Sequence, residues 1–279
     1  MTTNENGHGT TLLLGGTGRT GSRVARRLAA RGIGVRIGSR RGTPPFDWDD
    51  RTTWAPLLDG VDAAYVAFHP DLTVPGADET VAELAGLAAA AGVRRLVLLS
   101  GRGEEGAQRT EETVREAFPG RTVVRASWFA QNFSEAFLVD AVRSGVVALP
   151  VGDVREPFVD ADDIADVAVA ALTGDGHAGL VHEVTGPQLL TFAEAVDEVA
   201  RASRRPVRFE TVTPAELAAG LAAEGVPADA VELVTYLVTE VLDGRNAHLT
   251  DGVERVLGRP PRAFADVALE AAATGVWDA

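Results

Sequence analysis

A short apolar segment followed by regularly spaced glycines dominates the amino-terminal part of the chain. Thr11–Leu14 is long enough for a buried strand, glycines follow at positions 15, 18 and 21, and an apolar helical pattern continues to Ala30. In a strand–turn–helix unit, the first glycine allows a tight turn, the second lets the backbone approach a pyrophosphate and the third lets helix and strand pack closely. The start of the helix offers unpaired N–H groups and a partial positive charge. The segment therefore predicts a dinucleotide site beginning at Gly15.

Strand-like and helix-like stretches alternate up to about residue 130. Apolar stretches predict strands at 34–38, 62–68, 95–99 and 122–125, and helical patterns separate them at 79–91 and 108–118. This alternation predicts an α/β fold with a doubly wound parallel sheet, the Rossmann fold. Residues 1–150 are therefore assigned to a dinucleotide-binding domain.

The rest of the chain, residues 151–279, combines further strands with a mostly helical region. We expect short strands at 146–150, 156–159 and 180–184, and helices at 160–172, 191–202, 214–223, 228–242 and 263–273. Thr191 followed by Glu194 forms a capping-box pattern at a helix start. This part is expected to complete the sheet and to form a smaller helical substrate cap, interleaved with the first domain in one compact unit.

The turn after the second predicted strand carries the signal for the form of the dinucleotide. NAD sites place an acid there to hold the ribose 2′-hydroxyl, whereas NADP sites place an arginine near the 2′-phosphate. Here Ser39, Arg40 and Arg41 follow the strand, and no acid occurs before Asp47. A guanidinium can bind the phosphate with two hydrogen bonds, and a carboxylate would repel it. The turn favours NADPH or NADP; the alternative is a solvated basic turn.

The carboxyl ends of two later strands supply further candidate residues. Strand ends of this kind face the ligand crevice, so Ala67, Phe68 and His69 are expected near the ribose or nicotinamide, and Ser100 ends the next strand. His69 could donate a proton, although a lone histidine beside a proline is more commonly a loop residue.

Composition excludes several classes of function. The net charge is −14, which argues against a nucleic-acid partner. No lysine and no cysteine occur, which excludes lysine chemistry, thiol nucleophiles and thiolate metal sites. The histidines show no helical i, i+4 pairing, so no metal site is expected. A polar first segment without a secretion signal and the lack of a long apolar run predict a cytoplasmic protein that does not enter a membrane. The oligomeric state, monomer or homodimer, stays open.

Several motifs together resemble the NmrA-like branch of the atypical short-chain dehydrogenases/reductases. The matching pieces are GGTGRTG at 15–21, SRR at 39–41, LVLLS at 96–100, RASWFAQNF at 125–133, REPFVDADDIADVAVAAL at 155–172 and VTGPQLLTFAEAVDEVA at 184–200. They run over nearly the whole chain. The stretch around FDW at 46–48 and Trp54 is more loosely similar to the festuclavine dehydrogenases, which reduce an iminium with NADPH.

The resemblance implies roles for individual residues. The pyrophosphate would contact Thr17, Gly18, Arg19 and Thr20; Arg40 would contact the 2′-phosphate; and Phe46–Trp48 would lie near the adenine. A pocket for nicotinamide and substrate would be bordered by Trp128, Phe129, Asn132, Phe133 and Phe158. The alternative for these aromatic residues is ordinary core packing.

The pair that most short-chain dehydrogenases use for proton transfer, Tyr-x-x-x-Lys, is missing. The tyrosines are Tyr65 and Tyr236, and the chain has no lysine; Glu104 and Gln108 stand at the expected spacing after Ser100. The resemblance therefore favours hydride transfer to an acceptor that needs little proton help, such as an enone, a quinone or a cyclic imine. Ser100, His69 and Glu104 are weak catalytic candidates.

These observations predict an NADPH-dependent reductase of a small conjugated or iminium-type molecule, in specialised metabolism. Two alternatives stay open at this point. One is a non-catalytic NADP(H) sensor that binds a protein partner, and the other is a redox-neutral isomerase or cyclase on the same fold.

Overall fold

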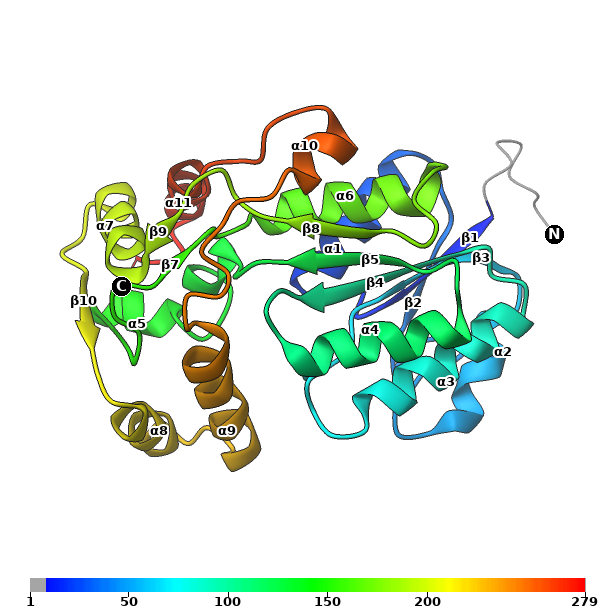
Figure 1. Cartoon of the computed structure of the whole chain (residues 1–279), viewed down its shortest axis with the longest axis horizontal. Coiled ribbons are helices and arrows are strands. Elements are labelled where there is room, and N and C mark those ends of the chain that lie inside the picture. Colours follow the sequence, from blue (N-terminus) through cyan, green and yellow to red (C-terminus); the bar gives the residue numbers. More distant parts are fainter. Residues whose placement is uncertain (1–8, 279) are drawn as a thin grey trace. The chain divides into compact units, whose positions relative to one another are not determined.

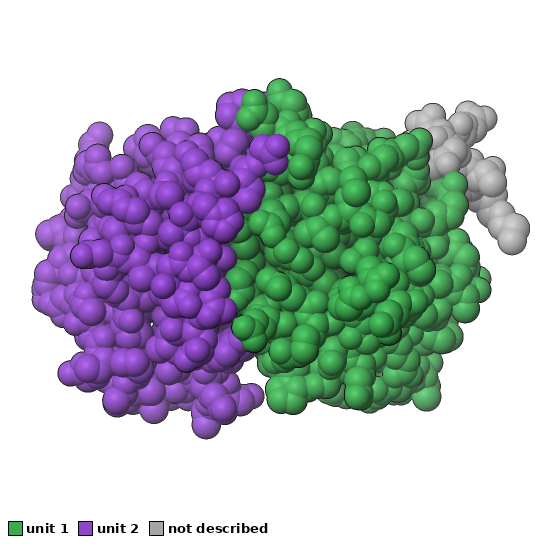
Figure 2. Space-filling model, in the orientation of Figure 1, with its two compact units in different colours: residues 1–126, 161–184, 252–258 green, residues 127–160, 185–251, 259–279 purple. Residues whose placement is uncertain are grey.

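The computed structural model describes residues 9–278, so the residues 1–8 that entered the localisation expectation lie outside this range. The chain forms two compact units (Figure 2). Unit 1 comprises the described residues up to 126 with 161–184 and 252–258, and unit 2 comprises 127–160, 185–251 and the described residues from 259. This differs from the expected division at residue 150 and from the single unit expected. The chain leaves unit 1 after residue 126, and two later segments return to its sheet.

Unit 1 is built on a six-stranded parallel sheet in the order β2-β1-β3-β4-β5-β8. The strands are β1 (Thr10–Leu14), β2 (Val35–Gly38), β3 (Val61–Val66), β4 (Arg95–Gly101), β5 (Thr122–Ala126) and β8 (Val181–Val184). The helices are α1 (Arg19–Ala30), α2 (Trp54–Leu58), α3 (Ala77–Ala90), α4 (Glu105–Ala117), α6 (Ala161–Thr173) and α10 (Gly252–Leu257), with a 3₁₀ turn, η1 (Arg51–Thr53). The predicted doubly wound α/β sheet is confirmed.

Helices cover both faces of this sheet. In Figure 1, α1 and α6 lie on one face, and α3 and α4 lie on the other. The central strands are therefore shielded from water on both sides, which explains why they read as continuous apolar runs. Leu12, Leu13 and Leu14 of β1, for example, are fully buried.

The strand order places the ligand edge. From β1 the chain runs outward to β2 and then returns to β3 on the other side of β1, so the direction of winding reverses between β1 and β3. In open α/β sheets ligands bind outside the carboxyl ends of the strands at this reversal. The glycine turn after β1 therefore stands at the point where a ligand is expected.

Unit 2 combines short strand pairs with helices. Its strands are β6 (Val146–Leu149), β7 (Arg155–Glu156), β9 (Leu190–Thr191) and β10 (Arg208–Thr211); β6 pairs with β10 in parallel and β7 with β9 antiparallel. Its helices are α5 (Val139–Ser144), α7 (Phe192–Ser203), α8 (Pro214–Ala223), α9 (Ala228–Tyr236) and α11 (Phe264–Ala273), with a 3₁₀ turn, η2 (Ala130–Phe133), and a π turn, η3 (Leu237–Val241). The predicted capping box at Thr191 and Glu194 is confirmed.

Two expectations for this unit need correction, and one strand was not predicted. The strand expected at 156–159 is only the pair Arg155–Glu156, with Val159 bridged to Phe129. The segment expected as one helix at 228–242 is α-helical only to Tyr236 and forms a π turn from Leu237 to Val241. Strand β10 was not predicted, because its residues are mostly exposed and give no apolar pattern. No helix within residues 9–278 is long and apolar enough to cross a membrane.

Candidate functional site

The glycine turn after β1 is closely packed, and two of its glycines are required for different reasons. Gly15 has φ +77°, a left-handed conformation, and a β-carbon there would lie 2.8 Å from the carbonyl oxygen of Ala67. A β-carbon on Gly21 would lie 2.2 Å from the carbonyl oxygen of Gly15. The N–H of Gly18 donates to that same carbonyl at 2.9 Å. The turn and the end of β3 are thus held against each other with no room for a side chain.

The start of α1 carries no negative charge. Its first turn contains no acidic residue, and its N-cap residue, Gly18, has no side chain that could bind the free N–H groups. In the described part of the chain, each other α-helix of nine or more residues has Asp or Glu in its first turn. Acids are favourable there because they complement the helix dipole. Among these longer helices only α1 lacks such an acid, which leaves its dipole available to an external anion.

The predicted pyrophosphate residues divide into two groups. Thr17 and Gly18 are exposed and Arg19 is half-buried, whereas Thr20 is buried. The hydroxyl of Tyr65 donates to Thr20 Oγ1 at 2.8 Å. Burial raises the pKa of Tyr65 above its ordinary value. Tyr65 therefore ties the glycine turn to β3 and is not placed as a surface acid or base.

A closed loop follows β2 and displays two arginines. The carbonyl of Ser39 accepts hydrogen bonds from the N–H groups of Gly42 and Phe46, both at 2.9 Å. Arg40 and Arg41 are exposed within this loop, and neither guanidinium has an ion-pair partner among residues 9–278. Two exposed guanidinium groups without counter-ions are available to bind a phosphate at this position.

Asp47 serves the next turn and does not oppose these arginines. Its N–H donates to Thr53 Oγ1 at 3.0 Å, its carbonyl accepts from Trp54 Nε1 at 2.7 Å, and its carboxylate accepts from the N–H of Asp49 at 3.2 Å. The turn leads into an aromatic cluster in which Trp48 lies 4.9 Å from Phe46 and 4.8 Å from Phe68 between ring centroids. The rings of Trp48 and Phe68 are partly exposed.

A partly buried charged network joins the ends of β4, β5 and β8. Arg125 lies in register with Ser100 on one side and Glu183 on the other. Arg125 donates to both oxygens of Glu111, at 2.9 and 2.5 Å, and to Glu183 at 2.7 Å. These bonds, with that to Glu111 first, raise the pKa of Arg125. The signal for this network in the sequence was Arg125 itself, a charge inside an apolar strand.

The side chain of Ser100 is hydrogen-bonded within this network. Its Oγ donates to Glu111 Oε1 at 2.6 Å, and its side chain is buried. The hydroxyl proton is therefore committed to a carboxylate, and its use on a substrate would require that bond to break. His69, by contrast, is exposed just beyond β3.

Glu104 lies at the same edge in a different environment. Its carboxyl rests directly against Gly101, where a β-carbon would lie 1.9 Å from Oε1. Burial, and then the negative charges of Asp71 and Glu111, raise the pKa of Glu104 to about 8. A carboxyl group of this kind is mostly neutral at pH 7 and can act as an acid.

The predicted substrate residues all belong to unit 2, and two of them, Phe133 and Phe158, are part of its core. Phe133 and Phe158 are almost fully buried and pack against Phe192 and Phe264. Trp128 and Phe129 are partly buried and Asn132 is buried. Their role toward a substrate stays a prediction.

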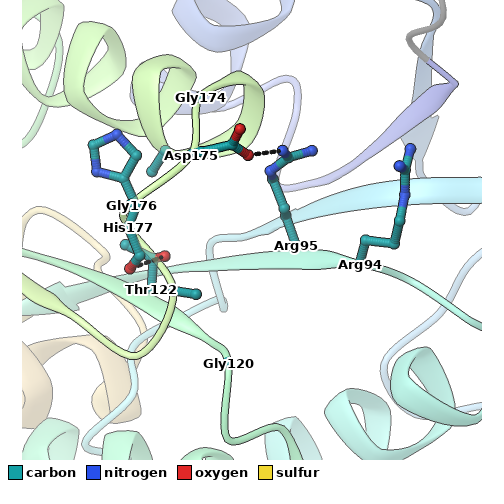
Figure 3. A pocket seen from close by; sticks show the side chains of 10 residues that line it. Arg94, Arg95, Gly120, Thr122, Gly174, Asp175, Gly176 and His177 are labelled. Atoms are coloured by element: carbon teal, nitrogen blue, oxygen red, sulfur yellow. Dashed lines mark hydrogen bonds and ion pairs between the residues drawn. The ribbon is translucent and has the colours of Figure 1, made fainter.

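A separate cavity of about 230 Å³ lies at the opposite edge of the unit 1 sheet (Figure 3). Its walls include the amino-terminal residues of β4 and β5 and the loop after α6. Figure 3 shows Arg95 bonded to Asp175, at 2.7 Å, and Thr122 bonded to the carbonyl of His177, at 2.8 Å. Because the glycine turn lies at the carboxyl edge, this cavity is not part of the dinucleotide site.

A histidine pair beside this cavity makes stability depend on pH. His177 Nδ1 and His182 Nε2 lie 3.0 Å apart, and burial, with the charges of His177 and Arg255, lowers the pKa of His182 to about 4. The unfolded chain binds a proton near pH 6.5 and the folded chain only near pH 4, so acidification across that window removes roughly 3 kcal/mol of stability. Chemical denaturation of His182→Gln should show a shallower loss between pH 6.5 and 4. The exposed control His248→Gln should retain the wild-type slope; an unchanged slope in His182→Gln would contradict the assignment.

Comparisons with known proteins identify dehydrogenases and reductases that are similar to this chain over almost its whole length. No family model matches the chain. A (4-alkanoyl-5-oxo-2,5-dihydrofuran-3-yl)methyl phosphate reductase from Streptomyces griseus is 35% identical over 93% of this chain and 96% of its own length. Agroclavine dehydrogenase from Claviceps fusiformis is 30% identical over 92% of this chain and 95% of its own length.

Solved structures share the fold. A triphenylmethane reductase from Citrobacter sp., complexed with NADP(H), has a TM-score of 0.75 at 20% identity and covers 94% of this chain and 99% of its own. NmrA, described as a negative transcriptional regulator in complex with NAD, has a TM-score of 0.72 at 17% identity, covering 96% of this chain and 98% of its own. With relatives at 30% identity or more over almost their entire length, the chain belongs to the NmrA-like branch of the atypical short-chain dehydrogenases/reductases and is an oxidoreductase of that family.

Proposed function

We propose that this protein is an NADPH-dependent reductase that transfers hydride to a small conjugated or iminium-type organic substrate. The observation that carries the proposal is the pairing of two features at one sheet edge. One is the acid-free start of α1 behind a turn that excludes side chains, and the other is the loop with Arg40 and Arg41 after β2. The residues present fit a phosphorylated dinucleotide.

The strand order supports one direction for the bound dinucleotide. Its pyrophosphate belongs at the start of α1, and the 2′-phosphate, which sits on the adenosine ribose, belongs at the arginines after β2. The nicotinamide half must then extend the other way, toward the carboxyl ends of β3 and β4. The partly exposed rings of Trp48 and Phe68, which contact each other near the ends of β2 and β3, would offer aromatic surface to a cofactor bound in this direction.

Arg40→Ala should weaken NADPH binding by roughly 10- to 100-fold, because a lost charge-assisted hydrogen bond is worth roughly 1.5–3 kcal/mol. NADH lacks the 2′-phosphate, so its affinity should change by less than about twofold. Isothermal titration calorimetry with NADPH and NADH measures both affinities. Arg26 is an exposed arginine on α1, and Arg26→Ala is the control. Equal losses for NADPH and NADH would remove the case for 2′-phosphate recognition.

The reductase itself is tested by the loss of absorbance at 340 nm. NADPH should be consumed with at least one acceptor from a panel of enones, quinones and cyclic imines, in proportion to protein concentration. The expected chemistry needs little beyond position and a dry site, because the bound nicotinamide supplies the hydride. Tight NADPH binding with no consumption by any acceptor would contradict the proposal. The Streptomyces griseus relative, whose name specifies a 5-oxo-2,5-dihydrofuran ring, makes butenolides the first compounds to try.

A further inference from the structure

Two glutamates at the carboxyl end of β4 have opposite surroundings. Glu111 on α4 is held by the guanidinium of Arg125 and the hydroxyl of Ser100. Glu104, in the loop before α4, has no hydrogen-bond or ion-pair partner for its carboxyl among residues 9–278. When neighbouring carboxyl groups are placed in such different environments, the unpaired one holds its proton more strongly.

The groups around Glu104 are acids. Asp71, from the loop between β3 and α3, accepts hydrogen bonds from the N–H and the hydroxyl of Thr73, each at 2.8 Å. Glu111, on α4, is the second acid whose charge acts on Glu104. Arg102, which follows Gly101, is bound to Glu183. Arg125 binds Glu111 and not Glu104, so among the described residues the charges that act on the Glu104 carboxyl are those of Asp71 and Glu111; burial and then these two charges raise its pKa to about 8.

Glu104 lies at the sheet edge where the proposed function places the nicotinamide. It comes shortly after the end of β4, as the N-cap residue of α4, on the side toward which the second half of the dinucleotide would extend from the arginines after β2. The packing against Gly101 is part of this arrangement, because any side chain at that position would displace the carboxyl.

A neutral acid at this place discriminates between substrate classes. An iminium needs no proton when it receives hydride, and its positive charge would be served by an ionised carboxylate. A conjugated carbonyl becomes an oxyanion on receiving hydride and needs a proton. The surroundings of Glu104 favour the second case.

We propose that the substrate is a conjugated carbonyl compound, an enone or quinone, and that Glu104 is the catalytic residue that protonates it. This inference rests on the proposed function. For an enone, hydride from the reduced nicotinamide forms a C–H bond at the β-carbon, and the electrons of the C=C bond move to the carbonyl oxygen. The Glu104 carboxyl then gives its proton to the enolate and regains one from water. The nicotinamide is oxidised and the substrate is reduced by two electrons and two hydrogens.

The test compares Glu104→Gln with the wild-type protein on an enone, a quinone and a cyclic iminium salt. A general acid contributes about 10²- to 10⁴-fold, so kcat for the conjugated carbonyls should fall by at least about 100-fold in Glu104→Gln. Any iminium reduction should change by less than about twofold, and so should NADPH affinity. Glu105→Gln, an exposed neighbour on α4, is the matched control and should retain full activity.

The pH dependence gives a second readout. The wild-type kcat/KM for the enone should fall above about pH 8 as the carboxyl loses its proton, and this limb should be missing in Glu104→Gln. A raised carboxyl pKa also makes the folded state lose stability as pH rises from about 4.5 to 8. The melting temperature of Glu104→Gln relative to that of the wild type should therefore increase as the pH rises from about 4.5 to 8. This measurement needs no substrate.

The outcomes separate this inference from the proposed function. Absence of NADPH consumption by the wild-type protein with every acceptor would contradict the proposed function. Wild-type turnover of enones or quinones with equal kcat in Glu104→Gln would overturn the role of Glu104 alone. Turnover confined to the iminium salt would overturn the substrate class while leaving the reductase in place.

Discussion

Gly21→Ala will lower the affinity for NADPH by at least about 100-fold. It will also lower the free energy of unfolding by roughly 1–3 kcal/mol, the usual cost of forcing an extra group into a packed site. The new methyl group would stand 2.2 Å from the carbonyl oxygen of Gly15 and 2.8 Å from the Cα of Gly16. These are backbone atoms, so no side-chain rotation can relieve the contact. The first turn of α1 must move away from β1, and the phosphate site moves with it.

Gly86→Ala is the matched control for this change. Gly86 also lies inside a helix, α3, but a β-carbon there meets no other atom within 4 Å. Alanine should therefore stabilise the protein by roughly 0.5–1 kcal/mol, as it does in open helix positions. Denaturant unfolding and NADPH titration of both variants check the pair. Wild-type cofactor affinity in Gly21→Ala would contradict the proposed phosphate site.

Arg125→Met will destabilise the protein by roughly 3–5 kcal/mol, because removing one partner of a buried ion pair leaves the other charge uncompensated. Glu111 would be the orphaned group: its side chain is only 4% exposed, and Arg125 supplies two of its hydrogen bonds. Urea unfolding measures the loss. An exposed pair, Arg115 and Glu112 on α4, provides the control, and Arg115→Met should cost less than about 1 kcal/mol.

A double-mutant cycle shows whether the loss belongs to the pair. Glu111→Gln keeps an oxygen for the Ser100 hydroxyl and removes the buried charge. The combination of Arg125→Met with Glu111→Gln should recover part of the stability lost in Arg125→Met. Additive losses in the double variant would show that Arg125 acts through its other contact, Glu183.

The sequence was most informative where local pattern and tertiary role coincide. The parallel strands β1, β3 and β4 are apolar because helices cover both faces of the sheet, and the glycines of the first turn report a backbone contact directly. The exposed strand β10 has neither property, and it forms only because β6 lies beside it. A pairing between segments so far apart cannot be read from the composition of one of them.

The sequence suggests specific residues for the cofactor half of the site, and these stay predictions; it gives little for the catalytic half. The positive charges of Arg40 and Arg41 after the second strand are visible in the sequence, and both residues are exposed in the structure. The commitment of Ser100 to Glu111, and the isolation of Glu104, depend on which side chains meet at the ends of separate strands. Likewise, the assignment of 161–184 and 252–258 to unit 1 results from long-range contacts that no local pattern encodes.

Calorimetric titration of the purified protein with NADPH, and in parallel with NADH, tests the central claim most directly. The glycine turn and the arginines after β2 predict one NADPH site per chain, with an affinity at least about tenfold higher than for NADH. Absence of heat with NADPH, or equal affinity for the two cofactors, would contradict the account.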